Sequence, residues 1–224
     1  RHGRRFFEEL RRVASRKPVV LWKGGRSEAG QRAIASHTAA LATPVAVWDG
    51  MLRQAGAIGV DGLDELLDVV RVLAAGRRPR GRRAGLIAMT GGPSVALTDA
   101  CAEAGLEVPL LSDESYARLA EFFNVIGGSL RNPLDAGSTV AMGFRSDNLR
   151  RLLDVLDADA GIDAVLVDVG TALSIDRWHE FPQALDAMID TLAEFAAASA
   201  KPCLVVLDPA HREAEGAALR GTWR

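Results

Sequence analysis

Apolar residues along this chain recur with two different periods. Near the N-terminus, Phe6, Leu10 and Val13 lie three or four positions apart, the spacing that places side chains on one face of a helix. Soon afterwards, residues 19–22 form a short unbroken apolar run, as expected for a buried strand. The two patterns alternate along most of the chain and predict a series of helices and strands.

The predicted elements are defined by this periodicity and by the turn residues between them. The predicted strands cover residues 19–22, 58–60, 84–89, 164–169 and 203–207. The predicted helices cover residues 4–15, 46–55, 63–73, 95–104, 114–123, 149–156 and 184–198, with one more beginning near Ser27. Residues 106–110 are expected to be extended, and residues 124–145 are expected to form a loop.

Strands that alternate with helices indicate βαβ crossovers, and therefore an α/β fold with parallel sheets covered by helices. Two glycine turns, at residues 24–27 and 90–94, each follow a predicted strand and precede a predicted helix. Ligands of such sheets bind at the carboxyl ends of the strands, which is where both turns lie.

The apolar pattern is interrupted once, by GRRPRGRR at residues 76–83. This run holds five arginines, two glycines and one proline. We interpret it as a solvated basic linker between a first domain, residues 1–75, and a second, residues 84–224. Nucleic-acid binding is the alternative use of such a run.

Composition and charge are those of an ordinary folded protein. Of 224 residues, 48% are hydrophobic and 25% are charged. The net charge of −2 provides no general attraction to nucleic acid or anionic membranes, and no apolar run is long enough to span a bilayer. Cys101 and Cys203 lack motif spacing, so we expect two free thiols in a reducing, cytoplasmic compartment. No residue cluster has metal-ligand spacing, so no metal site is expected.

The first glycine turn has the chemistry of a phosphate site. A helix N-terminus presents unbonded N–H groups and roughly half a positive charge, and glycine lets a ligand approach the backbone. Here Gly24 and Gly25 would allow that approach. Arg26 would offer a charged fork, and Ser27 would cap the helix.

The second turn repeats this chemistry. Gly91 and Gly92 would allow close approach, Pro93 suits the first helical position, and Ser94 is a further donor to an anion. Neither turn has the P-loop or the dinucleotide-binding pattern. Taken singly, each turn is therefore more simply explained as an ordinary strand–helix connection, with phosphate binding as the other interpretation.

His37 is the histidine with the clearest functional context. It lies among small residues, at positions 33–40, where a large partner can approach, and imidazole is a good nucleophile near neutral pH. From composition alone, a structural or surface role is favoured over a functional one. His179 and His211 lie in polar surroundings and are predicted to be solvated.

Two stretches, KPVVLWKGGRSEAGQRAIASHTAALA and AVWDGMLRQAGAIGVDGLDELLDV, resemble the ADP-forming (NDP-forming) acyl-CoA synthetases, relatives of succinyl-CoA synthetase. The segments TGGPSV, SLRNPLD, GIDAVLV and KPCLVVL also resemble this family, so the likeness covers nearly the whole chain. The resemblance implies two flavodoxin-like, three-layer subdomains with parallel sheets. The pairing of GRSEAG with SHT is its most specific part.

The resemblance also implies a mechanism. Inorganic phosphate attacks an acyl-CoA thioester, the resulting acyl phosphate transfers its phosphoryl group to His37, and the phosphohistidine phosphorylates ADP. The N-termini of the helices that open at Gly25–Ser27 and at Gly92–Ser94 would stabilise the phosphohistidine. CoA and ATP or ADP with Mg²⁺ are expected in the complete enzyme, and none of them is assigned to this part.

Family members also contain a CoA-binding domain and an ATP-grasp domain, which these residues do not include. We therefore expect a fragment or a single subunit that is inactive alone and that joins these domains, in the same chain or another, in an oligomer. Ala39 and Ser94 stand where glycine is common in the family, and their effect on activity is open. The acyl group and the choice of ADP or GDP are also open.

Two further hypotheses stand beside the ligase. One is a catalytically silent regulatory module, as in relatives fused to an acetyltransferase domain that have lost the histidine. The other is a plain flavodoxin-like module that binds a small anion. The presence of His37 favours the ligase over the silent module.

Overall fold

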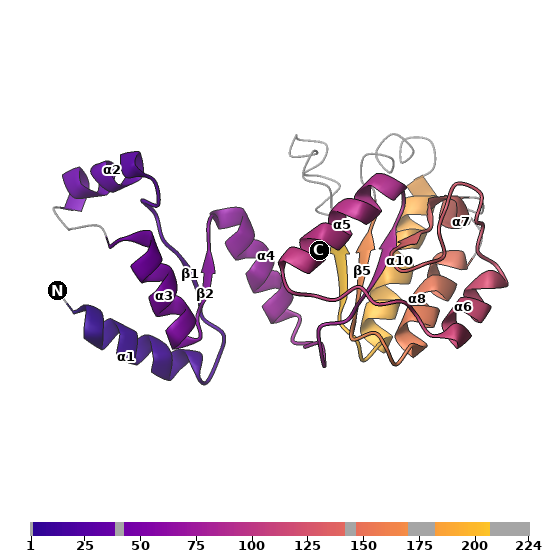
Figure 1. Cartoon of the computed structure of the whole chain (residues 1–224), viewed down its shortest axis with the longest axis horizontal. Helices are drawn as coiled ribbons and strands as arrows, with labels where there is room; N and C mark the ends of the chain where they lie inside the picture. The colour runs from indigo at the N-terminus through magenta and orange to yellow at the C-terminus, as the bar shows by residue number, and fades with distance from the viewer. Residues whose placement is uncertain (1, 39–42, 142–146, 170–181, 207–224) are drawn as a thin grey trace. The chain divides into compact units, whose positions relative to one another are not determined.

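The computed structural model describes residues 2–38, 43–141, 147–169 and 182–206 (Figure 1). The chain divides into two compact units, Arg1–Gly76 and Arg77–Arg224. Within the described residues, no helix has the length and apolar character needed to cross a membrane.

Unit 1 is a small α/β unit built on a two-stranded parallel sheet. Its elements are α1 (Gly3–Ala14), β1 (Val20–Trp22), α2 (Glu28–Thr38), α3 (Val45–Ala55), β2 (Ile58–Val60) and α4 (Leu63–Ala74). The strands pair in register from Val20 with Ile58 to Trp22 with Val60. Leu10 of α1 and Leu52 of α3 form the centre of its core, against which Leu21 of β1 packs.

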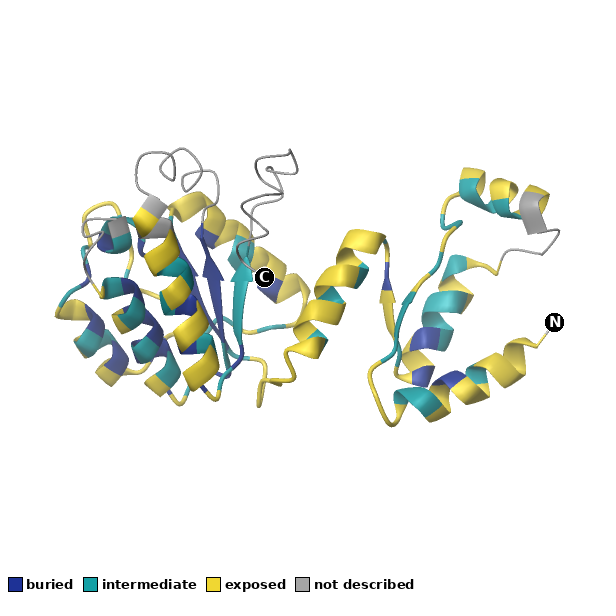
Figure 2. Cartoon of the chain, turned by 180° about the vertical axis from the view of Figure 1, so that it is seen from behind, coloured by how far each residue is buried: buried dark blue, intermediate teal, exposed yellow. Residues whose placement is uncertain are grey.

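Unit 2 is a larger α/β unit with a four-stranded parallel sheet in the order β4-β3-β5-β6. Its elements are β3 (Ala84–Ala88), α5 (Gly91–Glu103), α6 (Asp113–Ala120), β4 (Leu134–Asp135), α7 (Gly137–Ala141), α8 (Asn148–Ala158), β5 (Ala164–Asp168), α10 (Pro182–Ala198) and β6 (Cys203–Val206). Figure 2 shows the buried central strands between helices whose outer faces are exposed.

Alternate residues of the central strand β3 enter two different cores. Leu86 packs with Cys101 of α5, whereas Ile87 packs in the cluster that includes Leu152 of α8 and Phe195 of α10. Both faces of the sheet are therefore covered, which explains why all five residues of β3 are buried and apolar. The prediction of an α/β fold with parallel sheets is confirmed.

The helices and strands that the apolar pattern predicts are present, with differences at their ends. Residues 124–145, predicted to be a loop, contain the short elements β4 and α7, because two strand residues and one helical turn are too few to show a period. The helix after the second glycine turn begins at Gly91, so Pro93 occupies the third helical position instead of the first. This is tolerated because the first N–H groups of a helix have no intrahelical acceptor.

Three arginines of the basic run 76–83 donate hydrogen bonds to other parts of unit 2, and one of them, Arg82, donates to the carbonyl oxygen of Gly105 at 3.4 Å. Arg77 donates to the carbonyl oxygens of Ala196, Ala197 and Ser199 at the C-terminus of α10. Its charge thereby meets the negative end of the helix dipole.

Arg83 forms a bidentate pair with the buried carboxylate of Asp163, at 2.8 and 2.9 Å. The hydrogen bond from this guanidinium lowers the pKa of Asp163 to about 2. The last residue of the run is therefore part of the scaffold of unit 2 rather than of a fully solvated linker.

A buried amide completes the edge of the larger sheet. Asn132 accepts a hydrogen bond from the N–H of Leu86 at 2.9 Å and donates to the carbonyl oxygens of Ala84 and Pro109 at 2.9 and 2.8 Å. The side chain thus replaces backbone groups of a neighbouring strand, just before β4 begins. This fixes the segment that leads to the carboxyl edge of the sheet, where the second glycine turn lies.

Candidate functional site

The first glycine turn folds back on the helix that follows it. Gly25 has φ of +71°, a left-handed conformation that favours glycine, and a Cβ at this position would collide with Ile34. A Cβ on Gly30 would lie 2.9 Å from the Cα of Gly25. The turn and the first turns of α2 therefore pack closely only because both positions are glycine.

The N-terminus of α2 is occupied by its own side chains. The hydroxyl of Ser27 accepts a hydrogen bond from the N–H of Gly30 at 3.1 Å, as an N-cap does. Glu28 then places a carboxylate in the first helical turn. A cap and an acidic residue at the helix N-terminus satisfy part of the hydrogen-bonding capacity and positive dipole charge that a bound anion would otherwise neutralise.

Arg26 is held by two carboxylates. Its two Nη atoms each lie 3.2 Å from an oxygen of Asp49, and its Nε lies 3.1 Å from Asp61. The hydrogen bond with Asp49 raises the pKa of Arg26. The Arg26 guanidinium, which the sequence suggested as a phosphate ligand, contacts protein carboxylates instead. A role of Arg26 in phosphate binding therefore stays a prediction.

The backbone of His37 lies near the far end of α2. It follows Ser27 by ten residues, and at 1.5 Å per residue this places it about 15 Å from the capped N-terminus. The capped N-terminus of α2 and the backbone of His37 therefore lie near opposite ends of this helix, and a role of this N-terminus in holding a phosphoryl group on His37 stays a prediction. Of the other histidines singled out in the sequence, His179 and His211 lie outside the described residues.

The second glycine turn leaves its helix N-terminus open. Thr90 occupies the N-cap position with extended backbone, and in this fully described turn its side chain makes no capping hydrogen bond. The first turn of α5 also contains no acidic residue, and a Cβ built on Gly92 would meet nothing within 4 Å. The N–H groups of Gly91 and Gly92 precede the first intrahelical bond, which runs from the N–H of Ser94 to Thr90.

Two neighbours limit what this second turn can bind. Ser94 is buried and its hydroxyl donates to the carbonyl oxygen of Gly91 at 2.7 Å, so it points back into the turn. A Cβ on Gly91 would lie 3.2 Å from Oδ2 of Asp135, which places a carboxylate beside the turn. The backbone N–H groups, more than the Ser94 hydroxyl, are the donors available to an anion here.

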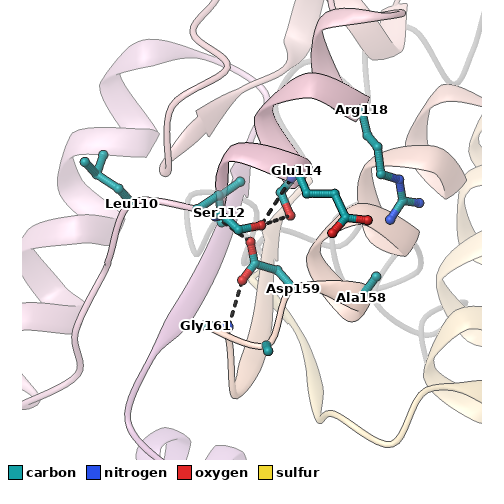
Figure 3. A pocket seen from close by; sticks show the side chains of 10 residues that line it. Leu110, Ser112, Glu114, Arg118, Ala158, Asp159 and Gly161 are labelled. Carbon is teal, nitrogen blue, oxygen red and sulfur yellow. Dashed lines mark hydrogen bonds between the residues drawn. The ribbon is translucent and has the colours of Figure 1, made fainter.

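A separate hollow of about 430 Å³ lies where α8 ends and α6 begins. Figure 3 shows Asp159 at its centre, with Glu114 and Arg118 projecting from α6. Asp159 as a whole residue is 4% exposed. It accepts from the N–H of Ser112 at 2.8 Å and from that of Gly161 at 2.7 Å.

Burial of Asp159 acts to raise its pKa, but hydrogen bonds from Ser112, Ser115 and Gly161 outweigh it, and the pKa is lowered. The carboxylate joins the start of α6 to the turn after α8, which is a structural role. Sequence patterns did not point to Asp159, because the neighbouring residues in the chain form no recognisable motif with it. Across the described ranges, no group of three or more His, Cys, Asp or Glu residues could hold a metal ion.

Comparison with known proteins shows which proteins this chain resembles. Residues 1–73 match the family model described as the succinyl-CoA ligase like flavodoxin domain. The chain is 30% identical over 164 residues to the alpha subunit of an ADP-forming acetate–CoA ligase II of Pyrococcus furiosus, covering 73% of this chain and 35% of that protein. It is 31% identical over 190 residues to an ADP-forming acetate–CoA ligase I of Archaeoglobus fulgidus, covering 84% of this chain and 26% of that protein.

The chain is therefore similar in sequence to ADP-forming acetate–CoA ligases, and its first 73 residues are similar to a succinyl-CoA ligase like flavodoxin domain. Among solved structures, the dinucleotide forming acetyl-coenzyme A synthetase 1 of Ca. Korarchaeum cryptofilum, in complex with phosphate and ADP, matches with a TM-score of 0.72 and 24% identity. That match covers 98% of this chain and 45% of that one, and it supports the fold. The chain thus spans about a quarter to a third of the length of the two acetate–CoA ligase proteins.

Proposed function

We propose that this chain is the phosphoryl-transfer part of an NDP-forming acyl-CoA synthetase and that His37 is its phosphoryl acceptor. The observation that carries the proposal is the relationship to ADP-forming acetate–CoA ligases over 73–84% of the chain. His37, within the SHT motif on α2, supplies the nucleophile that such a reaction needs.

The proposed reaction has three steps. An oxygen of inorganic phosphate attacks the thioester carbon, the carbon–sulfur bond breaks, and CoA leaves as the thiol. An imidazole nitrogen of His37 then attacks the phosphorus of the acyl phosphate, and the carboxylate leaves. Finally a β-phosphate oxygen of ADP attacks the phosphohistidine, which gives ATP and restores the neutral imidazole.

The proposed anion-holding group is the N-terminus of α5. It combines two early N–H groups, at Gly91 and Gly92, with an uncapped first turn that contains no acidic side chain. Fixed backbone dipoles of this kind stabilise a phosphoryl group without reorganising during the reaction. Gly24, Gly25 and Ser27 have the supporting role of shaping the turn that precedes α2.

CoA and the nucleotide are substrates that the proposal assigns mainly to other parts of the enzyme. A CoA-binding domain and an ATP-grasp domain, in the same chain or a separate subunit, would provide them, with Mg²⁺ accompanying the nucleotide. An oligomer that brings these domains together is part of the proposal.

The test is phosphoryl labelling of this chain mixed with its ATP-grasp and CoA-binding partners and ATP radiolabelled at the γ-phosphate. We expect a label that is labile in acid and stable in base, the behaviour of phosphohistidine. His37→Asn should carry no label, whereas the matched control His179→Asn should be labelled like the wild type.

Equal labelling of His37→Asn and the wild type would show that another residue accepts the phosphoryl group. The absence of label from every variant, with phosphate still bound at α5, would favour a silent anion-binding module.

A further inference from the structure

The arm that carries His37 has little apolar attachment to its unit. We define the α2 arm as residues 24–38, the first glycine turn together with α2. None of the described side chains of α2 is buried, and the core of unit 1 contains residues of α1, α3 and β1 but none from α2. Figures 1 and 2 show α2 lying beyond the end of α3, with its surface largely exposed. Something other than the hydrophobic core must fix its direction.

The glycine contacts of the turn do not do so, because they lie within the arm. Gly25 packs against Gly30 and Ile34, both of which belong to α2. These contacts fix the turn relative to the helix. They do not connect the arm to the rest of unit 1.

Two basic residues at the base of the arm reach the rest of unit 1. Arg26 binds Asp49 of α3 with both Nη atoms and Asp61, just after β2, with Nε. Lys23 donates to the carbonyl oxygen of Thr43 at 2.9 Å, where the chain returns from the arm. The side chains of Arg26 and Asp49 are only 32% and 31% exposed, so this bidentate pair is more shielded than an ordinary surface ion pair.

The surroundings of Arg26 also disfavour a phosphate ligand. Its bidentate edge faces Asp49, its Nε faces Asp61, and Glu65 adds a third negative charge nearby. A phosphate would have to displace a carboxylate and approach the remaining negative charges.

We propose that Arg26, supported by Lys23, is a positioning residue that fixes the direction of the α2 arm, and that it does not bind the phosphoryl group. This rests on the proposed function only in assigning chemistry to His37. A small change in the direction of the arm is amplified along α2. A tilt of about 10° at the base displaces a group that lies about 15 Å along the helix by roughly 2.5 Å. A misplacement of about 1 Å can lower a rate roughly a hundredfold.

The first experiment is hydrogen exchange of the full chain and needs no assumption about function. Arg26→Gln and Asp49→Asn should each accelerate exchange of the α2 amides about tenfold. The double variant should exchange no faster than Arg26→Gln alone, because that substitution already removes the contact with Asp49. Arg32→Gln, which removes a charge from α2 itself, is the matched control and should leave exchange unchanged.

The amides of α3 serve as the internal reference in the same experiment. They should keep their protection in Arg26→Gln, and Arg26→Lys should show an intermediate effect, since lysine keeps the charge but loses the bidentate fork. Equal acceleration in α3 and α2, or no response to Asp49→Asn, would overturn the positioning role.

The second experiment separates positioning from phosphate binding in the assembled enzyme. Arg26→Gln and Asp49→Asn should lower kcat by similar factors, tenfold or more, with KM for inorganic phosphate changed less than twofold. A raised KM for phosphate in Arg26→Gln, but not in Asp49→Asn, would show that Arg26 is a phosphate ligand.

The two experiments fail separately. If the α2 amides respond as expected but His37→Asn leaves labelling intact, the positioning of the arm stands and the role of His37 in the proposed function falls.

Discussion

The two glycine turns of this chain read alike in sequence, as GGRS and GGPS, yet the structure completes them differently. At the first turn, Ser27 caps α2, Glu28 adds a carboxylate, and Arg26 is paired with Asp49 and Asp61. At the second, α5 starts without a side-chain cap or an acidic residue within its described first turn. The N-terminus of α2 is satisfied by neighbouring side chains, whereas that of α5 has no side-chain cap.

This difference teaches that a helix N-terminus is not by itself an anion site. Its N–H groups and dipole are available only when no neighbouring side chain already satisfies them. In each turn, the serine two positions after the glycine pair decides whether the N–H groups are satisfied. The hydroxyl of Ser27 accepts a hydrogen bond from the N–H of Gly30. The hydroxyl of Ser94 instead donates to the carbonyl oxygen of Gly91, so it does not engage the N–H groups in the first turn of α5.

The sharpest way to break the comparison is a matched pair of alanine substitutions. Gly25→Ala should destabilise unit 1 by about 2 kcal/mol, because alanine disfavours a left-handed conformation and its Cβ would meet Ile34. Gly92→Ala should change stability by less than about 0.5 kcal/mol, because a Cβ there has open space. Denaturant unfolding of the full chain, with amide exchange to identify the unit affected, measures both. Equal effects would mean that the two turns do not differ in strain.

A smaller effect distinguishes the turns as anion sites. Gly92→Asp places a carboxylate at the open N-terminus of α5, and it should weaken binding of inorganic phosphate about tenfold, or roughly 1.4 kcal/mol. Gly24→Asp, the matched substitution in the first turn, should change it less than twofold. Titration with phosphate, followed by the amide shifts of residues 24–28 and 90–95, gives affinity and location together. Shifts confined to the first turn would reverse the assignment.

Much of the fold could be predicted from the sequence, because its long elements have clear apolar periods. The run of β3, residues 84–88, is buried on both faces and reads as a strand without ambiguity. β4 has two residues and α7 has five, and neither is long enough for a period. Their position depends on the side chain of Asn132, which replaces backbone hydrogen bonds at the sheet edge, and such a contact is invisible in a local pattern.

The site could be predicted only as far as its backbone. Both glycine turns do lie at strand ends before helices, as the pattern indicated. The partners of Arg26 lie 23 and 35 positions away, at Asp49 and Asp61, so its pairing depended on tertiary structure. The distance between Ser27 and His37 followed from helix length and could have been derived from the sequence, once both were placed on one helix.

The smallest expected effect on phosphate binding concerns Asp135, whose carboxylate lies beside Gly91 at the second turn. This charge opposes an incoming phosphate, so Asp135→Asn should tighten phosphate binding about threefold, or roughly 0.7 kcal/mol, and the gain should shrink as salt is added. Asp113→Asn, at the start of α6, is the control and should have no effect. Weaker binding in Asp135→Asn would mean that this carboxylate orients the N–H groups of the turn. The openness of α5 would then depend on a neighbouring strand as well as on its own first residues.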